Sequence, residues 1–290
     1  MKKIIRTISL LLLFPIGVFA QTKEIALSKK EIRKERPTYI GITFGLNSSK
    51  YRDFATSPLF YSGTPKSWGL SRHRLDDKKE THIGLSYASG TYTNSFNSHI
   101  APSSVKILSV YYSQLYQLNK FSSEKLNVKV GGLFNTTANL RINPSLQNNA
   151  GGIEVIPTLL GSIKLTKDIS RKEAKNKKFI FIKYKLKKRT RNLAFNLNVG
   201  LLNSSLRNGY AYTGQSSILN TPKLFDRYEF KMFSGFRMSS AFDYTISLNN
   251  KNKIQLSYLW DAYKTGGDLD QFNMISHTFK ITLLFNTNNK

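Results

Sequence analysis

The sequence contains no cysteine. This absence excludes disulfide bonds, thiolate metal sites and cysteine nucleophiles, and it leaves no thiol for lipid attachment after the N-terminal apolar segment. Acidic residues are scarce, because 17 Asp and Glu stand against 44 Lys and Arg, which gives a formal net charge of +27. Such a balance often indicates nucleic-acid binding. Here the cations lie largely in turns and no nucleic-acid-binding module accompanies them, so we expect no nucleic acid as a partner.

Long hydrophobic runs are also missing beyond the first 20 residues, where no run approaches the roughly 20 residues of a membrane helix. This does not exclude a membrane protein, because a transmembrane strand needs only about 9–11 residues, half of them apolar. The one apolar run, Ile8–Phe19, follows three cations (Lys2, Lys3 and Arg6) and ends at Val18-Phe19-Ala20. This pattern predicts a signal peptide over residues 1–20.

Cleavage is expected before Gln21, and loss of the three signal cations would lower the net charge from +27 to +24. Residues 21–37 are polar and charged, and we interpret them as a periplasmic N-terminal leader. The remaining chain, 38–290, holds the alternating pattern that carries the fold.

The clearest alternation lies near the end of the chain, where apolar side chains occupy even positions over 21 residues. The apolar positions are Tyr228, Phe230, Met232, Phe236, Met238, Phe242, Tyr244, Ile246 and Leu248, interrupted only by Ser234 and Ser240. A period of two predicts a strand with one apolar and one polar face. Strands of ordinary globular proteins run about 3–10 residues, so this pattern favours a barrel wall between lipid and a polar lumen.

Similar alternation recurs along 38–290 and predicts ten strands. They lie at about 40–46, 68–75, 81–96, 104–118, 126–134, 153–165, 193–201, 228–248, 254–261 and 279–285. We therefore predict an all-β fold, a single transmembrane antiparallel up-and-down β-barrel of about 10 strands, with 12 as the alternative. Gly90 is expected to mark a bulge, because Tyr92 and Phe96 change parity after it. Strand 104–118 has apolar residues on both faces, which leaves its orientation open.

Residues 166–191 break the alternation, with twelve Lys or Arg and only two acids. Because both ends of an even-stranded barrel lie in the periplasm, this basic segment falls on the periplasmic side. Its cations Lys183, Lys185, Lys187, Lys188 and Arg189 are predicted to contact lipid or a partner. The stretch Phe179–Leu186 could form a short strand, and the strand count would change if that strand joined the wall.

The signal peptide, the alternating wall and the aromatic last strand HTFKITLLF resemble Gram-negative outer-membrane β-barrel proteins. The Lys-, Asn- and Tyr-rich style is similar to small barrels of the Bacteroidota. The resemblance implies an outer-membrane location and recognition of the strand ending at Phe285 by the assembly machinery. It is architectural and brings no catalytic residues, because fold does not determine function.

Catalytic chemistry has weak candidates. Asp261, Asp268, Asp270 and His277 surround one outer loop, as acidic pairs and a His do in ten-stranded outer-membrane proteases. Gly and Asp also favour ordinary turns, and the two loop carboxylates fall short of the six to eight oxygen ligands of calcium. Ser71 and His73 share a strand face, which we interpret as a polar pair. We therefore expect neither an enzyme nor a cofactor or metal site.

Charged residues of both signs are predicted to face the lumen. They are Lys129, Glu154, Lys164, Glu229, Lys231, Arg237, Asp243, Asp261 and Lys280. A ten-stranded barrel is only slightly wider than the eight-stranded barrels that side chains fill. These charges should therefore pair and close the lumen, which disfavours a freely conducting pore.

The sequence favours a non-enzymatic outer-membrane barrel that acts as a structural or accessory subunit with partner-contacting outer loops. One alternative is a narrow passive channel, and another is a surface hydrolase, either a protease or a lipid deacylase, at the outer rim. Expected partners are outer-membrane lipid and a protein of the outer membrane or periplasm. No motif identifies a ligand.

Overall fold

The computed structural model describes residues 36–96, 99–186, 188–208, 228–267 and 270–288. The predicted signal peptide and residues 21–35 of the leader lie outside the described residues, and so do residues 209–227. In the described part of the chain, no helix is long and apolar enough to cross a membrane. All the strands of the described residues lie within Pro37–Lys290.

Fifteen strands and two short 3₁₀ helices make up the described chain. The strands are β1 (Thr38–Asp53), β2 (Ser57–Gly63), β3 (Lys66–Leu75), β4 (Lys79–Phe96), β5 (His99–Gln117), β6 (Leu126–Ile142), β7 (Gly151–Asp168), β8 (Lys175–Phe179), β9 (Ile182–Leu186), β10 (Arg191–Asn203), β11 (Ser205–Asn208), β12 (Tyr228–Lys231), β13 (Phe236–Ser247), β14 (Lys253–Lys264) and β15 (Phe272–Asn286). The 3₁₀ helices are η1 (Asn119–Phe121) and η2 (Pro144–Asn149).

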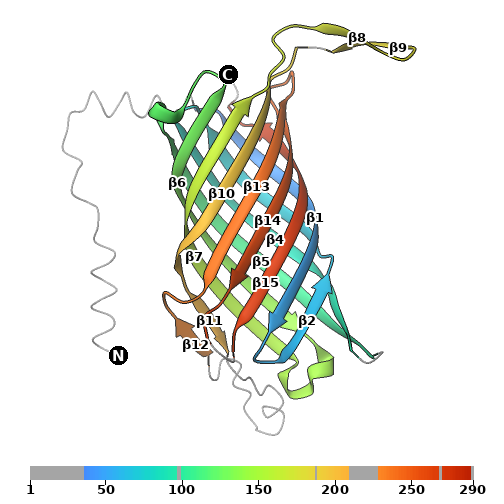
Figure 1. Cartoon of the computed structure of the whole chain (residues 1–290), viewed down its shortest axis with the longest axis vertical. Helices are drawn as coiled ribbons and strands as arrows, with labels where there is room; N and C mark the ends of the chain where they lie inside the picture. Colours follow the sequence, from blue (N-terminus) through green and yellow to red (C-terminus); the bar gives the residue numbers. More distant parts are fainter. Residues whose placement is uncertain (1–35, 97–98, 187, 209–227, 268–269, 289–290) are drawn as a thin grey trace, which may run out of the picture. The chain divides into compact units, whose positions relative to one another are not determined.

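Ten antiparallel wall strands close into a barrel (Figure 1). Three of them are interrupted, since β2 with β3, β10 with β11 and β12 with β13 each form one wall strand. The wall strand made of β2 and β3 pairs with both β1 and β4. The wall strand made of β10 and β11 pairs with the one made of β12 and β13. Closure is made by β1 and β15, which pair without interruption from Tyr39↔Asn286 to Asp53↔Phe272. The predicted ten-stranded antiparallel barrel is therefore confirmed.

The basic segment contributes no strand to the wall. β8 and β9 pair only with each other and form a separate two-stranded sheet. An isolated bridge between Arg171 and Arg189 links this hairpin to the ends of β7 and β10. The alternative in which Phe179–Leu186 joins the wall and the strand number rises to 12 is therefore wrong.

The barrel has two ends that differ in their connections. The terminal end holds Pro37 and Thr287, which bond to the ends of β3 and β1, together with the turns at 76–78 and 248–252. The basic segment also leaves the barrel at this end (Figure 1), between the paired ends of β7 and β10. The far end holds the turns that join β1 to β2, β6 to β7 and β14 to β15.

Large apolar side chains cover the outer face of the wall. Leu46 and Phe279 are each 67% exposed, and Trp68 is 52% exposed. In β5, Leu108, Val110 and Tyr112 are exposed, whereas Val105 is 1% exposed. The orientation that the sequence left open is thereby fixed, because its even positions face outward and its odd positions face the lumen.

Two details of the predicted strands are wrong. The stripe at 228–248 is not one continuous strand, because Phe233 (φ 52°) and Gly235 (φ 95°) adopt left-handed backbone and interrupt the wall strand between β12 and β13. Gly90 marks no bulge, since β4 pairs with β5 in continuous register. Tyr92 changes parity because its ring faces the lumen. Glycine is needed at position 90 because a Cβ there would lie 2.6 Å from Pro65 Cα.

Candidate functional site: a lumen closed at the far end

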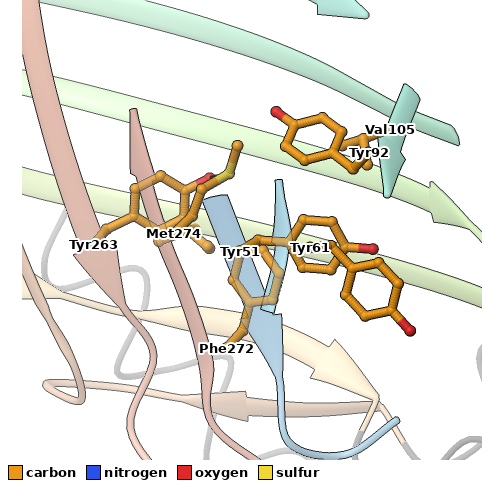
Figure 2. Close-up of a cluster of buried hydrophobic side chains, with 8 residues drawn as sticks. Tyr51, Tyr61, Tyr92, Val105, Tyr263, Phe272 and Met274 are labelled. Carbon is orange, nitrogen blue, oxygen red and sulfur yellow. Dashed lines mark hydrogen bonds between the residues drawn. The ribbon is translucent and has the colours of Figure 1, made fainter. Parts of the chain in front are cut away.

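An apolar cluster fills the lumen near the far end. We call its eight buried residues the far-end plug: Tyr51, Tyr61, Tyr92, Val105, Ile156, Tyr263, Phe272 and Met274. They come from seven strands around the wall and point toward one another (Figure 2). Tyr51 lies at the centre, because its ring stacks on Tyr61 at 5.1 Å and lies 5.4 Å from Tyr92 and 5.9 Å from Phe272.

Three of the four plug tyrosines, Tyr51, Tyr92 and Tyr263, have hydroxyls that are hydrogen-bonded within the barrel. Tyr51 OH donates to Ser103 Oγ at 2.7 Å, and Tyr92 OH lies 2.5 Å from Ser49 Oγ. Asn139 Nδ2 donates to Tyr263 OH at 3.1 Å. Buried polar groups without partners are costly. These bonds allow tyrosine, with its larger ring and polar tip, to be buried in the plug.

An ionic quartet of Asp53, Arg141, Glu154 and Arg207 packs against the plug. Asp53 bridges both arginines, with N–O distances of 2.5 Å to Arg141 and 2.5 Å to Arg207. Arg141 also pairs with Glu154. The four side chains are at most 5% exposed, and the Arg141 guanidinium lies 5.0 Å from the centre of the Phe272 ring. Two cations and two anions balance, which buried charges require.

A polar chamber occupies the lumen between the plug and the terminal end. Its volume is about 870 Å³, and Tyr263 and Met274 form part of its inner boundary. Its lining extends to Asp76, Asp77 and Glu124 in the turns of the terminal end. The lumen is therefore a chamber that reaches one end of the barrel and stops at the plug.

Ion pairs lie in the chamber at two levels. Near the plug, Arg237 holds Asp261 through two nitrogens at 2.7 and 3.2 Å, and it donates to Thr137 Oγ1 at 2.9 Å. Nearer the terminal end, Glu80 accepts from Lys164 at 2.5 Å. Lys129 Nζ lies 3.6 Å from the same carboxylate. Arg237 and Asp261 join the neighbouring strands β13 and β14, whereas Glu80 joins β4 to β6 and β7 across the polar interior.

Ser71 and His73 meet inside this chamber. Ser71 Oγ and His73 Nε2 are 2.9 Å apart, and the His73 ring stacks on His82 with centroids 3.8 Å apart. His82 Nε2 in turn lies 3.5 Å from Tyr111 OH. The described residues bring no group of three or more His, Asp and Glu together with metal-binding geometry. The four side chains form a row along the chamber wall, in which a ring stack joins two hydrogen-bonded pairs.

The predicted lumen residues take three kinds of position. Lys129, Lys164, Arg237, Asp243, Asp261 and Lys280 line the chamber. Glu154 is fully buried in the ionic quartet. Lys231 is at the far rim, 2.6 Å from Asp270. Glu229 lies at the same rim, where its side chain is 72% exposed and 4.0 Å from Lys231.

The structure does not assemble the outer-rim catalytic candidates. Asp261 lines the chamber, whereas His277 is exposed on the opposite face of the wall, 2.7 Å from Tyr258 OH. Asp270 is paired with Lys231. Asp268 lies outside the described residues. Asp261 pairs with Ser276, whereas His277 pairs with Trp260. Asp261 and His277 therefore lie on opposite faces of the wall and cannot act on one substrate atom.

The predicted contact cations belong to the hairpin and its return to the wall. Lys183 and Lys185 lie in β9, and Lys188 and Arg189 follow it. Lys187 lies outside the described residues. The hairpin tip exposes two apolar side chains, because Ile180 is 66% and Phe181 is 91% exposed. We call the β8–β9 hairpin, together with the cations that flank it, the arm. The arm combines a basic sequence with an apolar tip.

Comparison with known proteins found no matching family model and no matching curated protein. Among solved structures, the chain is similar to the translocator domain of the autotransporter NalP from Neisseria meningitidis. That match has 8% identity and a TM-score of 0.36, and it covers 89% of this chain and 92% of that one. The β domain of the Bordetella autotransporter BrkA matches with 10% identity, covers 87% and 100% of the two chains and has a TM-score of 0.35.

A third similar structure is the Pseudomonas putida toluene transporter TodX. Its identity is 9%, its TM-score is 0.32, and the match covers 88% of this chain and 91% of that chain. All three are barrel proteins of low similarity to this chain. None of them indicates what this chain binds or does.

Proposed function

We propose that this chain is an outer-membrane barrel that does not conduct and that serves as a structural or accessory subunit. The far-end plug carries the proposal. An aromatic cluster of side chains at most 6% exposed fills the lumen, and a charge-balanced quartet packs on it. A passive channel needs a continuous water-filled path, which a packed cluster of this kind blocks.

The outer face supports the membrane location. Apolar side chains such as Phe44 (45% exposed) and Ile281 (52% exposed) surround the wall, while polar side chains line the chamber. This arrangement matches the apolar-out, polar-in pattern of transmembrane barrels. In the proposed orientation the terminal end faces the periplasm, as expected when both chain ends lie there.

Contact with other molecules is assigned to the β8–β9 hairpin and its flanking cations. The hairpin forms a sheet separate from the wall, so the hairpin can dock without any change in barrel packing. Each Lys or Arg near an anionic membrane surface contributes about 1 kcal/mol. Lipid headgroups, or an acidic surface on a protein partner, therefore fit this arm.

Conductance in planar lipid bilayers tests the closed lumen. We expect the unmodified barrel to insert without single-channel steps. The second candidate, a narrow passive channel, is favoured by the polar chamber, which leaves the plug as the main obstruction. Regular open steps from the unmodified barrel would replace the scaffold proposal with the channel.

Proteolysis in reconstituted bilayers tests the arm. Chymotrypsin should cut after Phe181, which is 91% exposed, when the lipids are zwitterionic. Anionic lipids should protect this site, and 1 M salt should remove the protection, because the Debye length falls to about 3 Å. The protection should also be lost when Gln replaces the five cations Lys183, Lys185, Lys187, Lys188 and Arg189.

The matched control places Gln at Lys78 and Lys120, which lie in other turns of the terminal end. For each charge removed, these substitutions should change the protection of the Phe181 site by anionic lipids only slightly. Equal cleavage in both lipids would leave an acidic protein partner as the target. Co-isolation from native membranes with and without the Gln substitutions would then decide it. If the Gln substitutions weaken neither the protection by anionic lipids nor the co-isolation of a protein partner, the contact role of the arm is refuted.

A further inference from the structure

The turn of the β8–β9 hairpin carries an unusual residue at its first position. Phe179 pairs with Ile182, so the loop consists of Ile180 and Phe181 alone. Ile180 has a φ of 53°, and the first position of a two-residue hairpin loop with positive φ normally holds Gly, Asn or Asp. A left-handed backbone is a genuine outlier for a β-branched side chain. Isoleucine is therefore disfavoured here by the conformation of the turn.

Burial does not compensate for this strain. Ile180 is 66% exposed and Phe181 is 91% exposed, so the described part of the chain leaves most of both side chains uncovered. A turn that only joined two strands would carry small polar residues. Strained residues that persist in a structure often mark functional positions. An exposed apolar pair in a strained turn therefore indicates contact with something outside the chain.

The sequence around the tip indicates the chemistry of that contact. Residues 175–190 include eight Lys or Arg and no acid. Phe179–Ile182 is the only run of adjacent apolar residues in the basic segment 166–191. An acidic protein surface would attract the cations alone. An anionic bilayer satisfies both features, because its headgroups attract the cations and its hydrocarbon accepts the apolar tip.

The hydrocarbon layer of a surrounding bilayer lies within reach of the tip. Leu165 and Leu193, near the terminal ends of β7 and β10, face outward and are 38% and 42% exposed, so the apolar face of the wall extends to the root of the arm. Pairing continues beyond the wall as far as the bridge between Arg171 and Arg189. The 15 residues from Leu165 to Ile180 span at most about 50 Å, so the tip can return to the membrane surface.

We propose that Ile180 and Phe181 insert into the hydrocarbon layer of the anionic leaflet around the terminal end of the barrel. This inference rests on the proposed contact role of the arm and deepens it, since the cations hold the arm at the headgroups and the tip anchors it below them. Stable attachment of a short segment to a membrane requires two such signals. The tip alone and the cations alone are each insufficient.

Tryptophan quenching in reconstituted bilayers tests the insertion in the full chain. The chain has two tryptophans, Trp68 and Trp260, and replacing both with Phe leaves Phe181→Trp as the reporter. Lipids brominated on their acyl chains quench a tryptophan that reaches the hydrocarbon layer. We expect strong quenching and blue-shifted emission in anionic bilayers, with little of either in zwitterionic bilayers. Ala174→Trp, at the exposed base of the arm, is the control reporter and should remain largely unquenched.

A polar substitution in the turn separates contact from conformation. Asn adopts left-handed backbone more readily than Ile, so Ile180→Asn should relieve the turn. It also removes half of the apolar tip, so the ratio of inserted to withdrawn tips should fall about tenfold or more. A purely structural Ile180 would give no such loss. Ile100→Asn is the matched control, because Ile100 is 70% exposed at the far end, and it should leave the quenching unchanged.

The outcomes separate the insertion from the contact role of the arm. An unquenched reporter in anionic bilayers, with the Phe181 site still protected from chymotrypsin, would overturn the insertion and leave the arm on the headgroups. Protection by an acidic protein without quenching would also overturn it, as would equal quenching with Ile180→Asn. Quenching that persists in zwitterionic bilayers and in 1 M salt, where charges are screened, would support insertion and refute the cations as anchors.

Discussion

Removal of one plug ring tests whether the far end of the lumen is a packed core. Phe272 is 0% exposed and lies 6.1 Å from Tyr263 and 5.9 Å from Tyr51, measured between ring centroids. Phe→Ala in such a core costs about 3–5 kcal/mol, because the lost burial is joined by the cost of a cavity. We expect Phe272→Ala to lower the free energy of unfolding by this amount.

Phe242→Ala is the matched control, because it deletes the same atoms from the outer face, where the ring is 53% exposed. Full burial of Phe contributes about 1.5–3 kcal/mol, so about half of that should be lost, and lipid or detergent can fill the space. Denaturant unfolding in detergent micelles, followed by tryptophan fluorescence, measures both variants. Equal losses for the two variants would refute a packed plug, whatever the conductance of the barrel.

Two further predictions concern the wall and the arm. Phe242→Arg, near the middle of β13 on the outer face, should cost about 2–4 kcal/mol in a bilayer, whereas Ser257→Arg faces the chamber and should cost less; equal unfolding free energies would contradict the assigned faces. An epitope tag inserted at Lys175 should leave barrel assembly intact, because β8 bonds only to β9, and failure of the tagged chain to insert would contradict a free hairpin.

The wall was predictable because lipid imposes a simple rule on its outer face. Every second residue must be apolar there, so strands such as 153–165 and 193–201 alternate clearly. The same rule separates Asp261 from His277, since His277 shares parity with the outward Phe279 and Ile281. The outer-rim constellation could therefore have been rejected from the sequence.

The plug and the quartet were not predictable in this way. Lys50 and Arg52 occupy outward positions of β1 near the far end, so alternation disappears and this part of the strand resembles a loop. Asp53 was consequently missed. Arg141 and Arg207 were also missed, because they lie beyond the ends of the predicted strands 126–134 and 193–201. Tyr92 gave the one available signal, because an aromatic residue out of phase with its strand indicates an apolar group directed into the lumen.

The quartet provides a final prediction about residues that the sequence placed in loops. Asp53→Asn leaves Arg141 and Arg207 facing one carboxylate, Glu154. Loss of one member of a buried ion pair costs about 3–5 kcal/mol, because an uncompensated charge remains. Arg207→Gln alone removes a cation and leaves Asp53 paired with Arg141. The double variant restores balance through Arg141 and Glu154.

The combined loss of unfolding free energy should therefore be smaller than the sum of the two single losses, by about 1–3 kcal/mol, as expected for residues in direct contact. Asp53→Asn with Lys106→Gln is the control, since Lys106 is exposed on the outer face, and these effects should add within about 0.5 kcal/mol. Additivity of Asp53 and Arg207 would mean that the two do not meet. The far end would then lack the charge-balanced network that packs on the plug.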